Sequence, residues 1–158
     1  MTQCTFITVG TLKEKYLSDT LAEYAKRIGA FAKWEEINLK EEKLSDESPS
    51  NVAAALESEA DKILAKIPKD AFVVALCIEG KMLSSEELAR AVGNAVSASG
   101  KLCFIIGSSY GLSDRIKAKA DLKLSFSRLT FPHQLVRVIL AEAVYRSFTI
   151  LSGKKYHK

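Results

Sequence analysis

Cysteine, histidine and proline are all scarce in this chain, whose 158 residues include three cysteines, two histidines and three prolines. Cys4, Cys77 and Cys103 are odd in number and widely spaced, and each lies inside an apolar run. Cysteines in such runs are usually buried thiols, whereas disulfide frameworks and metal sites use paired or clustered cysteines. We therefore expect three buried thiols, no disulfide and no metal site.

Long hydrophobic runs are missing as well. No apolar run approaches the ~20 residues that a membrane-spanning helix needs. The opening MTQCTFITVG also lacks the basic start and the cleavage region of a secretory signal. We therefore expect a cytoplasmic protein that does not associate with membranes.

The chain does have enough apolar material for one core. It is 47% hydrophobic and 27% charged, proportions that are typical of a compact globular domain. Residues 1–158 are predicted to form a single domain, because a second independent core would need a longer chain. No internal repeat or low-complexity tract suggests another organisation.

Short β-rich runs alternate with longer stretches of helical periodicity along the chain. The predicted strands are 5–9, 34–39, 72–77, 102–106 and 122–125, and the predicted helices are 12–28, 50–67, 84–97, 113–120 and 134–150. Residues 72–78 and 102–106 are continuously apolar, which is typical of central parallel strands covered on both faces. The pattern predicts an α/β fold with a parallel sheet flanked by helices. The charged stretch 40–49 lacks periodicity and is predicted to be an exposed loop.

Charge is distributed unevenly along the chain. Residues 101–158 contain 11 lysines and arginines against 3 acidic residues, a net +8, whereas residues 1–100 contain 12 against 16, a net −4. This asymmetry predicts a surface for a polyanion, at the same end as the glycine-rich loops. The last residues fit RNA, with lysines for phosphates and Tyr156 or His157 for stacking on an unpaired base. A frayed tail without function is the alternative interpretation.

Glycines follow the third and fourth predicted strands, Gly80 after one and Gly107 and Gly111 after the other. In open α/β sheets, ligands bind outside the carboxyl ends of the strands, where glycine lets backbone amides approach the ligand. Residues 126–132 form a third loop at the same edge if their strand is parallel. The three loops predict a pocket for an adenosine-sized ligand, with simple chain turns as the alternative. Neither G-x-G-x-x-G nor G-x-x-x-x-G-K-[ST] occurs, so phosphate binding is the weaker interpretation.

The final predicted helix, 134–150, is apolar around most of its circumference. Such a helix must be covered on every side, and we expect a second copy of the chain to provide part of the cover, with burial inside one chain as the alternative. Arg137 and Arg146 lie about half a turn apart, so they could share a patch across a two-fold dimer but not on one helix. Each arginine is predicted either to join an internal ion pair, as Arg146 can with Glu142, or to contact an anionic substrate.

Three segments carry a resemblance to a known family: I-I-G-x-x-x-G-L from Ile105, L-S-x-S-x-L-T-F-P-H-Q-L-V-R-V-x-L-x-E-x-x-Y-R from Leu124, and the terminal Y-H-K. With these motifs, and with a similarity that covers its whole length, the chain resembles the RlmH family of SPOUT-class methyltransferases. That family methylates N3 of a pseudouridine in 23S ribosomal RNA with S-adenosyl-L-methionine. Ser108 stands where the family usually has a second glycine.

The resemblance implies a role for each of these segments. The implied cofactor-binding residues are Leu76, Gly107, Phe126, Ser127, Arg128, Leu129, Thr130 and Phe131. The implied catalytic and RNA-facing residues are His133, Arg137, Arg146, Tyr156 and His157. The resemblance also implies a C-terminal trefoil knot, a homodimer with cofactor pockets near its interface, and assembled ribosomes as the substrate.

The chemistry of such a transfer requires a nitrogen nucleophile held in line with an activated methyl group. The imide nitrogen of pseudouridine must lose its proton, which His133, His157 or solvent could accept, while Arg137 and Arg146 could stabilise the anion.

Three other functions fit the sequence less fully. They are a SPOUT methyltransferase acting on transfer RNA, a non-catalytic RNA-binding assembly factor, and a flavodoxin-like domain with a different small ligand.

Overall fold

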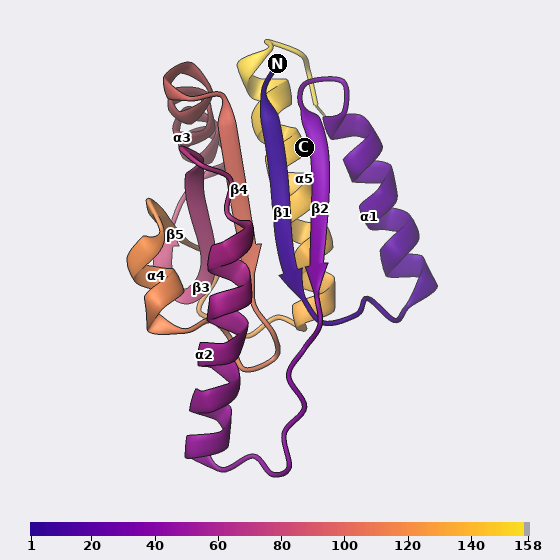
Figure 1. Cartoon of the computed structure of the whole chain (residues 1–158). Helices are drawn as coiled ribbons and strands as arrows, with labels where there is room; N and C mark the ends of the chain where they lie inside the picture. Colours follow the sequence, from indigo (N-terminus) through magenta and orange to yellow (C-terminus); the bar gives the residue numbers. More distant parts are fainter. Residues whose placement is uncertain (157–158) are drawn as a thin grey trace.

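Strands and helices alternate along the whole chain (Figure 1). In the computed structural model, which describes residues 1–156, the strands are β1 (Gln3–Val9), β2 (Lys33–Leu39), β3 (Phe72–Met82), β4 (Lys101–Ile106) and β5 (Leu122–Ser125). The helices are α1 (Lys15–Ile28), α2 (Pro49–Lys66), α3 (Ser85–Ala98), α4 (Asp114–Lys119) and α5 (His133–Leu151). Each predicted strand and helix is present, and apart from the end of β3 every boundary lies within three residues of the prediction.

The strands form one parallel sheet in the order β2-β1-β4-β3-β5. The inner strands β1 and β4 are buried along almost their whole length. Because all the strands run in the same direction, the loops that follow them emerge at one edge of the sheet, where ligands bind in folds of this class. The predicted α/β fold is confirmed, while the trefoil knot stays a prediction.

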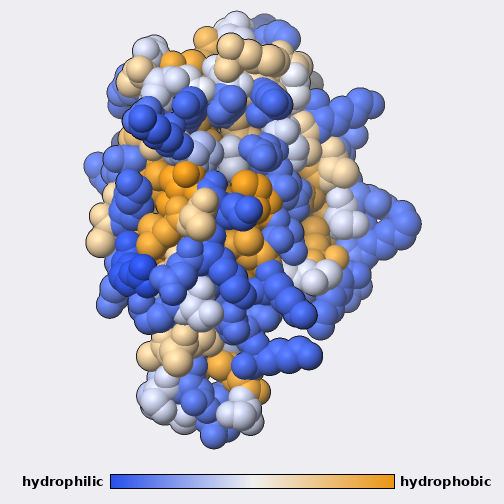
Figure 2. Space-filling model, viewed as in Figure 1, coloured by the Kyte–Doolittle hydropathy of each residue, from blue (hydrophilic) through white to orange (hydrophobic). Residues whose placement is uncertain are grey.

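Helices cover both faces of the sheet. Side chains alternate between the two faces along a strand, so Phe6 and Phe104 pack with α1, α3 and α5, while Ile7 and Ile105 pack with α2 and α4. This double cover explains why the inner strands are apolar at successive positions. On the face that carries α2 and α4, some apolar surface is visible between the polar side chains (Figure 2).

β3 continues beyond the end that the sequence predicted at residue 77. Leu76 and Lys81 both pair with Leu124 of β5, so residues 77–80 bulge out of the sheet. A Cβ atom on Gly80 would lie 2.7 Å from the backbone carbonyl carbon of Leu124. Glycine is therefore needed at this position for β3 to return against β5, and the bulge carries residues 77–79 to the carboxyl edge of the sheet.

α5 lies between α1 and α3 and contacts both helices (Figure 1). Nine of its 19 residues are buried and seven more are half-buried, so the chain covers most of this apolar helix by itself. Leu135 and Ile150 nevertheless keep 38% and 39% of their surface exposed. Cover by a second copy of the chain stays a prediction for this remaining surface.

Within residues 1–156, α5 included, none of the helices has the length and hydrophobicity that a membrane span requires.

Candidate functional site

A cavity of about 330 Å³ opens at the carboxyl edge of the sheet. Its walls come mainly from three loops, residues 76–79 at the bulge of β3, residues 106–112 after β4, and residues 125–131 after β5. We refer to it as the three-loop cavity. Since β4, β3 and β5 are parallel neighbours, the predicted loops do meet at one edge. Small-molecule sites have volumes of roughly 300–1,000 Å³, so the cavity is large enough for a small ligand.

Most of the residues predicted to bind a cofactor line this cavity. They are Leu76, Gly107, Phe126, Ser127, Leu129, Thr130 and Phe131. Arg128 belongs to the same loop but is not among the lining residues. His133 and Val136 complete the wall from the first turn of α5. The structure thus joins one predicted catalytic residue, His133, to the predicted cofactor-binding loops.

Gly107 is required by the shape of its loop. A Cβ atom on Gly107 would lie 2.2 Å from the carbonyl oxygen of Gly111, because the loop folds back on itself. Gly111 donates its N–H to the carbonyl oxygen of Ser108 at 2.9 Å and has a φ of +88°. Ser108 is buried and is not among the described residues with positive φ. Serine therefore fits this position without backbone strain.

Several polar residues of the cavity were missed by the sequence analysis, among them Cys77, Glu79 and Lys117. Lys117 of α4 forms an ion pair with Glu79, which holds the pKa of Glu79 below its usual range. The bulge of β3 brings Glu79 to this place, and its position beside Gly80 was the signal that could have revealed it. In the described part of the chain, no group of three His, Cys, Asp or Glu side chains is arranged to hold a metal ion.

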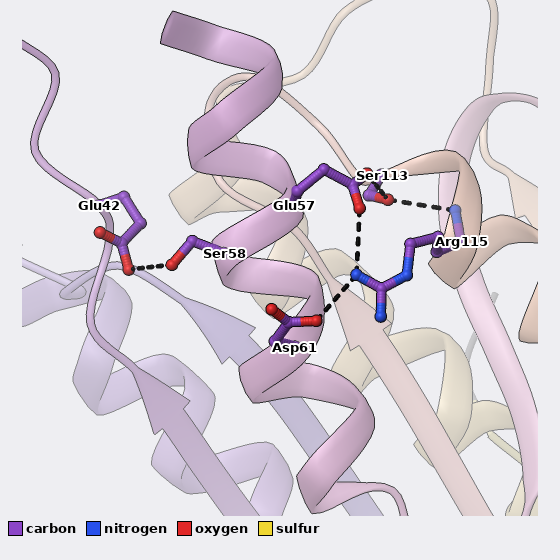
Figure 3. Close-up of polar contacts among 6 residues, drawn as sticks. All are labelled: Glu42, Glu57, Ser58, Asp61, Ser113 and Arg115. Carbon is purple, nitrogen blue, oxygen red and sulfur yellow. Dashed lines mark hydrogen bonds and ion pairs between the residues drawn. The ribbon is translucent and has the colours of Figure 1, made fainter.

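α4 is anchored to α2 by a cluster of polar contacts (Figure 3). The Ser113 hydroxyl, which caps α4, donates to Glu57 at 2.7 Å, and the Arg115 guanidinium donates to Glu57 at 3.0 Å and to Asp61 at 2.8 Å. Hydrogen bonds from Ser113 and Arg115 lower the pKa of Glu57. Exposed ion pairs contribute only about 0–1 kcal/mol each, so this cluster matters chiefly for the position of α4 and its Lys117.

The charged stretch 40–49 forms the predicted loop and contacts the cavity wall from outside. The Tyr110 hydroxyl donates to Glu47 at 2.7 Å, and the Ser109 hydroxyl donates to Glu41 at 3.4 Å. The base of the loop is held on α2, where Ser58 donates to Glu42 at 2.9 Å (Figure 3). These contacts support the wall of the cavity from the side that faces solvent.

Arg137 lies in the interior, although the resemblance placed it at the RNA or the active centre. Its side chain is completely buried, and Nη2 donates to the carbonyl oxygens of Val9 at 2.8 Å and Gly10 at 2.9 Å. Within residues 1–156, Nε and Nη1 have no hydrogen-bond partner. Burial lowers the pKa of Arg137, an effect that the negative charges of Glu36 and Glu41 oppose. Arg137 therefore joins α5 to the end of β1, and its role at the RNA or the active centre stays a prediction.

Arg146 and Tyr156 lie far from the three-loop cavity. The 13 residues from His133 to Arg146 correspond to about 20 Å along a helix. Arg146 donates to Glu142 at 2.6 Å, as predicted, and its Cζ lies 4.6 Å from the centre of the Tyr156 ring. Within a single chain, Arg146 and Tyr156 therefore lie at the other end of α5 from the cavity, while a polyanion surface beside the glycine-rich loops stays a prediction for the basic segment 101–158. His157 lies outside the described residues.

Comparisons with known proteins agree on one family. The model of the family described as "Predicted SPOUT methyltransferase" matches residues 2–157. A protein of Bacillus pumilus named "Ribosomal RNA large subunit methyltransferase H" is 51% identical over 96% of this chain and 97% of its own length. A Streptococcus pneumoniae protein of the same name is 50% identical, again over 96% of this chain and 97% of its own length.

Two solved structures share the fold at low sequence identity. A "probable methylase family protein" from Haemophilus influenzae has a TM-score of 0.53 and 15% identity, over 98% of this chain and 70% of that chain. A tRNA (m1G37) methyltransferase from Aquifex aeolicus has a TM-score of 0.51 and 16% identity, over 91% of this chain and 69% of that chain. At this identity the likeness supports the α/β fold and not a substrate.

The cavity predicts the reactivity of the thiols. Cys4 and Cys103 are buried as expected, but Cys77 is partly exposed and lines the cavity, which corrects the prediction of three buried thiols. Burial, reinforced by Glu79, raises the pKa of the Cys77 thiol. Because the thiolate is the reactive form, we expect iodoacetamide to modify Cys77 alone in the native protein, slowly at neutral pH and faster as the pH rises.

Mass spectrometry of peptides from the modified protein measures this selectivity. The Cys77→Ser variant is the control, and it is expected to take up no label while folded and to be labelled at both other cysteines in denaturant. Labelling of Cys103 at a rate similar to Cys77 in the native protein would contradict the structure.

Proposed function

The chain belongs to the SPOUT methyltransferase family, and from this membership we propose that it methylates ribosomal RNA of the large subunit. The observation that carries the proposal is about 50% identity, over almost the whole chain, to proteins named for that activity. The target that we propose is N3 of a pseudouridine in 23S ribosomal RNA, as the resemblance to the RlmH family implies. Ribosomes are cytoplasmic, so we also propose that the protein acts in the cytoplasm.

The three-loop cavity is the site that we propose for S-adenosyl-L-methionine. Leu76, Ile106 and Val136 provide apolar walls of the kind that suits a purine ring. The absence of a side chain at Gly107 lets its loop fold back onto Gly111 and so form this part of the wall. Leu76, Gly107 and the lining residues of the loop 126–131 would hold the cofactor. When bound, S-adenosyl-L-methionine supplies an activated methyl group on a sulfonium. The residues of the chain then have to align the acceptor nitrogen and exclude water, which can contribute roughly 7–11 kcal/mol to catalysis.

His133 is the residue that we propose as proton acceptor for the imide nitrogen. It lines the cavity at the first position of α5, where a general base could reach a base bound beside the cofactor loops. Two contacts hold this turn at the edge of the sheet. Arg137 bonds to the carbonyl oxygens of Val9 and Gly10, and the Gln134 side chain accepts a hydrogen bond from the Lys13 N–H at 3.3 Å.

Arg146 and Tyr156 are proposed to act at the cavity of a second copy of the chain. They lie about 20 Å along α5 from His133, so they do not reach the cavity of their own chain. A two-fold dimer with antiparallel α5 helices would bring the Arg146 end of one helix to the His133 end of the other. The exposed apolar side chains Leu135 and Ile150 on α5 offer part of the surface that such a contact would cover.

Cofactor binding predicts protection of Cys77. Since this thiol lines the three-loop cavity, saturating S-adenosyl-L-methionine or S-adenosylhomocysteine is expected to slow its alkylation by iodoacetamide, as measured by mass spectrometry. In the Gly107→Ala variant the new Cβ would meet Gly111 O at 2.2 Å, so we expect the loop to be distorted, at a cost of about 1–3 kcal/mol in the free energy of unfolding, and the protection by cofactor to be weakened. Equal alkylation rates with and without cofactor would mean that it does not bind in this cavity.

Methylation of ribosomal RNA is tested by mass mapping of nucleosides. Cells that lack the protein are expected to lose N3-methylation of a pseudouridine in 23S ribosomal RNA, and the wild-type gene but not the Gly107→Ala variant should restore it. In vitro, we expect assembled ribosomal particles to be better substrates than naked RNA, because a chain this small would read the shape of the folded RNA. The same methylated nucleoside in both strains, or methylation of transfer RNA instead, would contradict the proposal.

The shared site predicts complementation between two inactive variants. Gly107→Ala damages the cavity and Arg146→Ala removes the arginine, so each homodimer is expected to be inactive. A mixed dimer contains one complete site, and random pairing should restore about a quarter of the wild-type activity, since half of the dimers are mixed and half of their sites are complete. Co-expression with two affinity tags yields the mixed dimers. If purified mixed dimers show no methyl transfer, Arg146 does not act across the subunits.

A further inference from the structure

The chain turns back on itself after α5. Gly153 has a φ of +72° and donates its N–H to Ile150 O at 3.2 Å, while Lys154 donates its N–H to Thr149 O at 3.1 Å. These two bonds are those of a Schellman motif, which ends a helix at a residue in the left-handed conformation and redirects the chain. The residues that follow run back beside α5 and do not extend away from it (Figure 1).

Tyr156 packs against two residues of α5 on this return path. Its ring lies 5.0 Å from the ring of Tyr145 at an angle of 90°, and the Cζ of Arg146 lies 4.6 Å from its centre. Edge-to-face aromatic pairs and cations above a ring are both attractive. The end of the described chain is therefore held in place, whereas a frayed tail would lack such contacts.

Tyr145, on which Tyr156 packs, is itself packed against α1. The Tyr24 ring lies 6.2 Å from the Tyr145 ring, and the Cζ of Arg27 lies 5.4 Å from the centre of Tyr24 and 5.7 Å from that of Tyr145. Burial, and after it an interaction with the Tyr24 side chain, raises the pKa of Tyr156 to about 12. Tyr24, Tyr145, Arg146 and Tyr156 form what we refer to as the tail cluster.

We propose that Tyr24 is a positioning residue, which holds Tyr156 where the tail acts in methyl transfer to RNA. Tyr145 and Arg146 both belong to α5, so Tyr24 is the member from a second helix. Its ring packs on Tyr145, and Tyr156 packs on Tyr145 in turn, so Tyr24 acts on the tail through Tyr145. This inference rests on the proposed function, because it assigns Tyr24 a role in the same reaction. Tyr24 does not touch the three-loop cavity, so its effect should appear with the RNA substrate and not with the cofactor.

Kinetics with Tyr24→Leu test the proposal. We expect kcat/KM for ribosomal particles to fall roughly 3- to 10-fold, the factor that corresponds to the loss of one aromatic contact. Protection of Cys77 by S-adenosyl-L-methionine should stay unchanged. Tyr24→Phe keeps the ring and should retain most of the activity. The matched control is Tyr16→Leu on the same helix, which has 67% of its surface exposed and should behave as wild type.

A double-mutant cycle separates positioning from a general structural effect. If Tyr24 acts through Tyr156, Tyr24→Leu should cause no further loss in a Tyr156→Ala background. Independent, multiplying losses would overturn the proposal, and so would a wild-type rate in Tyr24→Leu. A parallel loss of cofactor protection would also overturn it, because the role would then be merely structural.

Backbone relaxation of the tail provides a readout that does not need catalysis. In the wild-type protein, the backbone amides of Lys155 and Tyr156 should have NMR order parameters of about 0.85, the value of a rigid backbone. In Tyr24→Leu the order parameters of the same amides should fall below about 0.6. Unchanged order parameters would show that Tyr24 does not hold the tail. Failure of the wild-type protein to methylate ribosomal RNA would instead refute the proposed function, while leaving this measurement intact.

Discussion

The buried guanidinium of Arg137 is the interaction on which the arrangement of the site depends. It joins the first turn of α5 to the carboxyl end of β1 through two hydrogen bonds, to Val9 at 2.8 Å and Gly10 at 2.9 Å. A buried charge is costly, and charge-assisted hydrogen bonds to carbonyl oxygens offset part of that cost. The contact settles which end of α5 meets the edge of the sheet, so that His133 and Val136 become part of the three-loop cavity.

Once that turn is in place, the geometry of the helix decides where the other functional residues lie. A helix rises about 1.5 Å per residue, so Arg146 and the tail that returns to it are held well away from the cavity. Glu142 pairs with Arg146, Tyr156 packs on Tyr145, and Tyr145 packs on Tyr24 of α1, so the tail cluster is held by its own contacts. The three-loop cavity and the tail cluster thus lie at opposite ends of one helix, and the proposed dimer is the arrangement that would bring them together.

The cavity itself depends on two close backbone contacts. Gly80 lets β3 return against β5 and Gly107 lets its loop fold onto Gly111, and neither position has room for a Cβ atom. The sequence analysis found both glycines, because a glycine after an apolar strand is a local signal, and the resemblance pointed to most of the lining residues of the loop 126–131. Sequence alone did not assign Cys77 and Glu79 to the cavity, because the bulge that carries them there is a shift in the pairing of β3 with Leu124, a distant segment, and Gly80 is its only local sign.

The sequence by itself determined the order and type of the strands and helices, the parallel sheet, the loops at its carboxyl edge and the resemblance carried by the last third of the chain. These features follow from hydrophobic periodicity and from residue types that act within a few positions. Only the tertiary structure decided that Arg137 is internal and that Tyr156 lies far from the cavity of its own chain. The physical reason is that burial and distance depend on contacts between segments more than 100 residues apart, such as α5 with β1, which periodicity does not record.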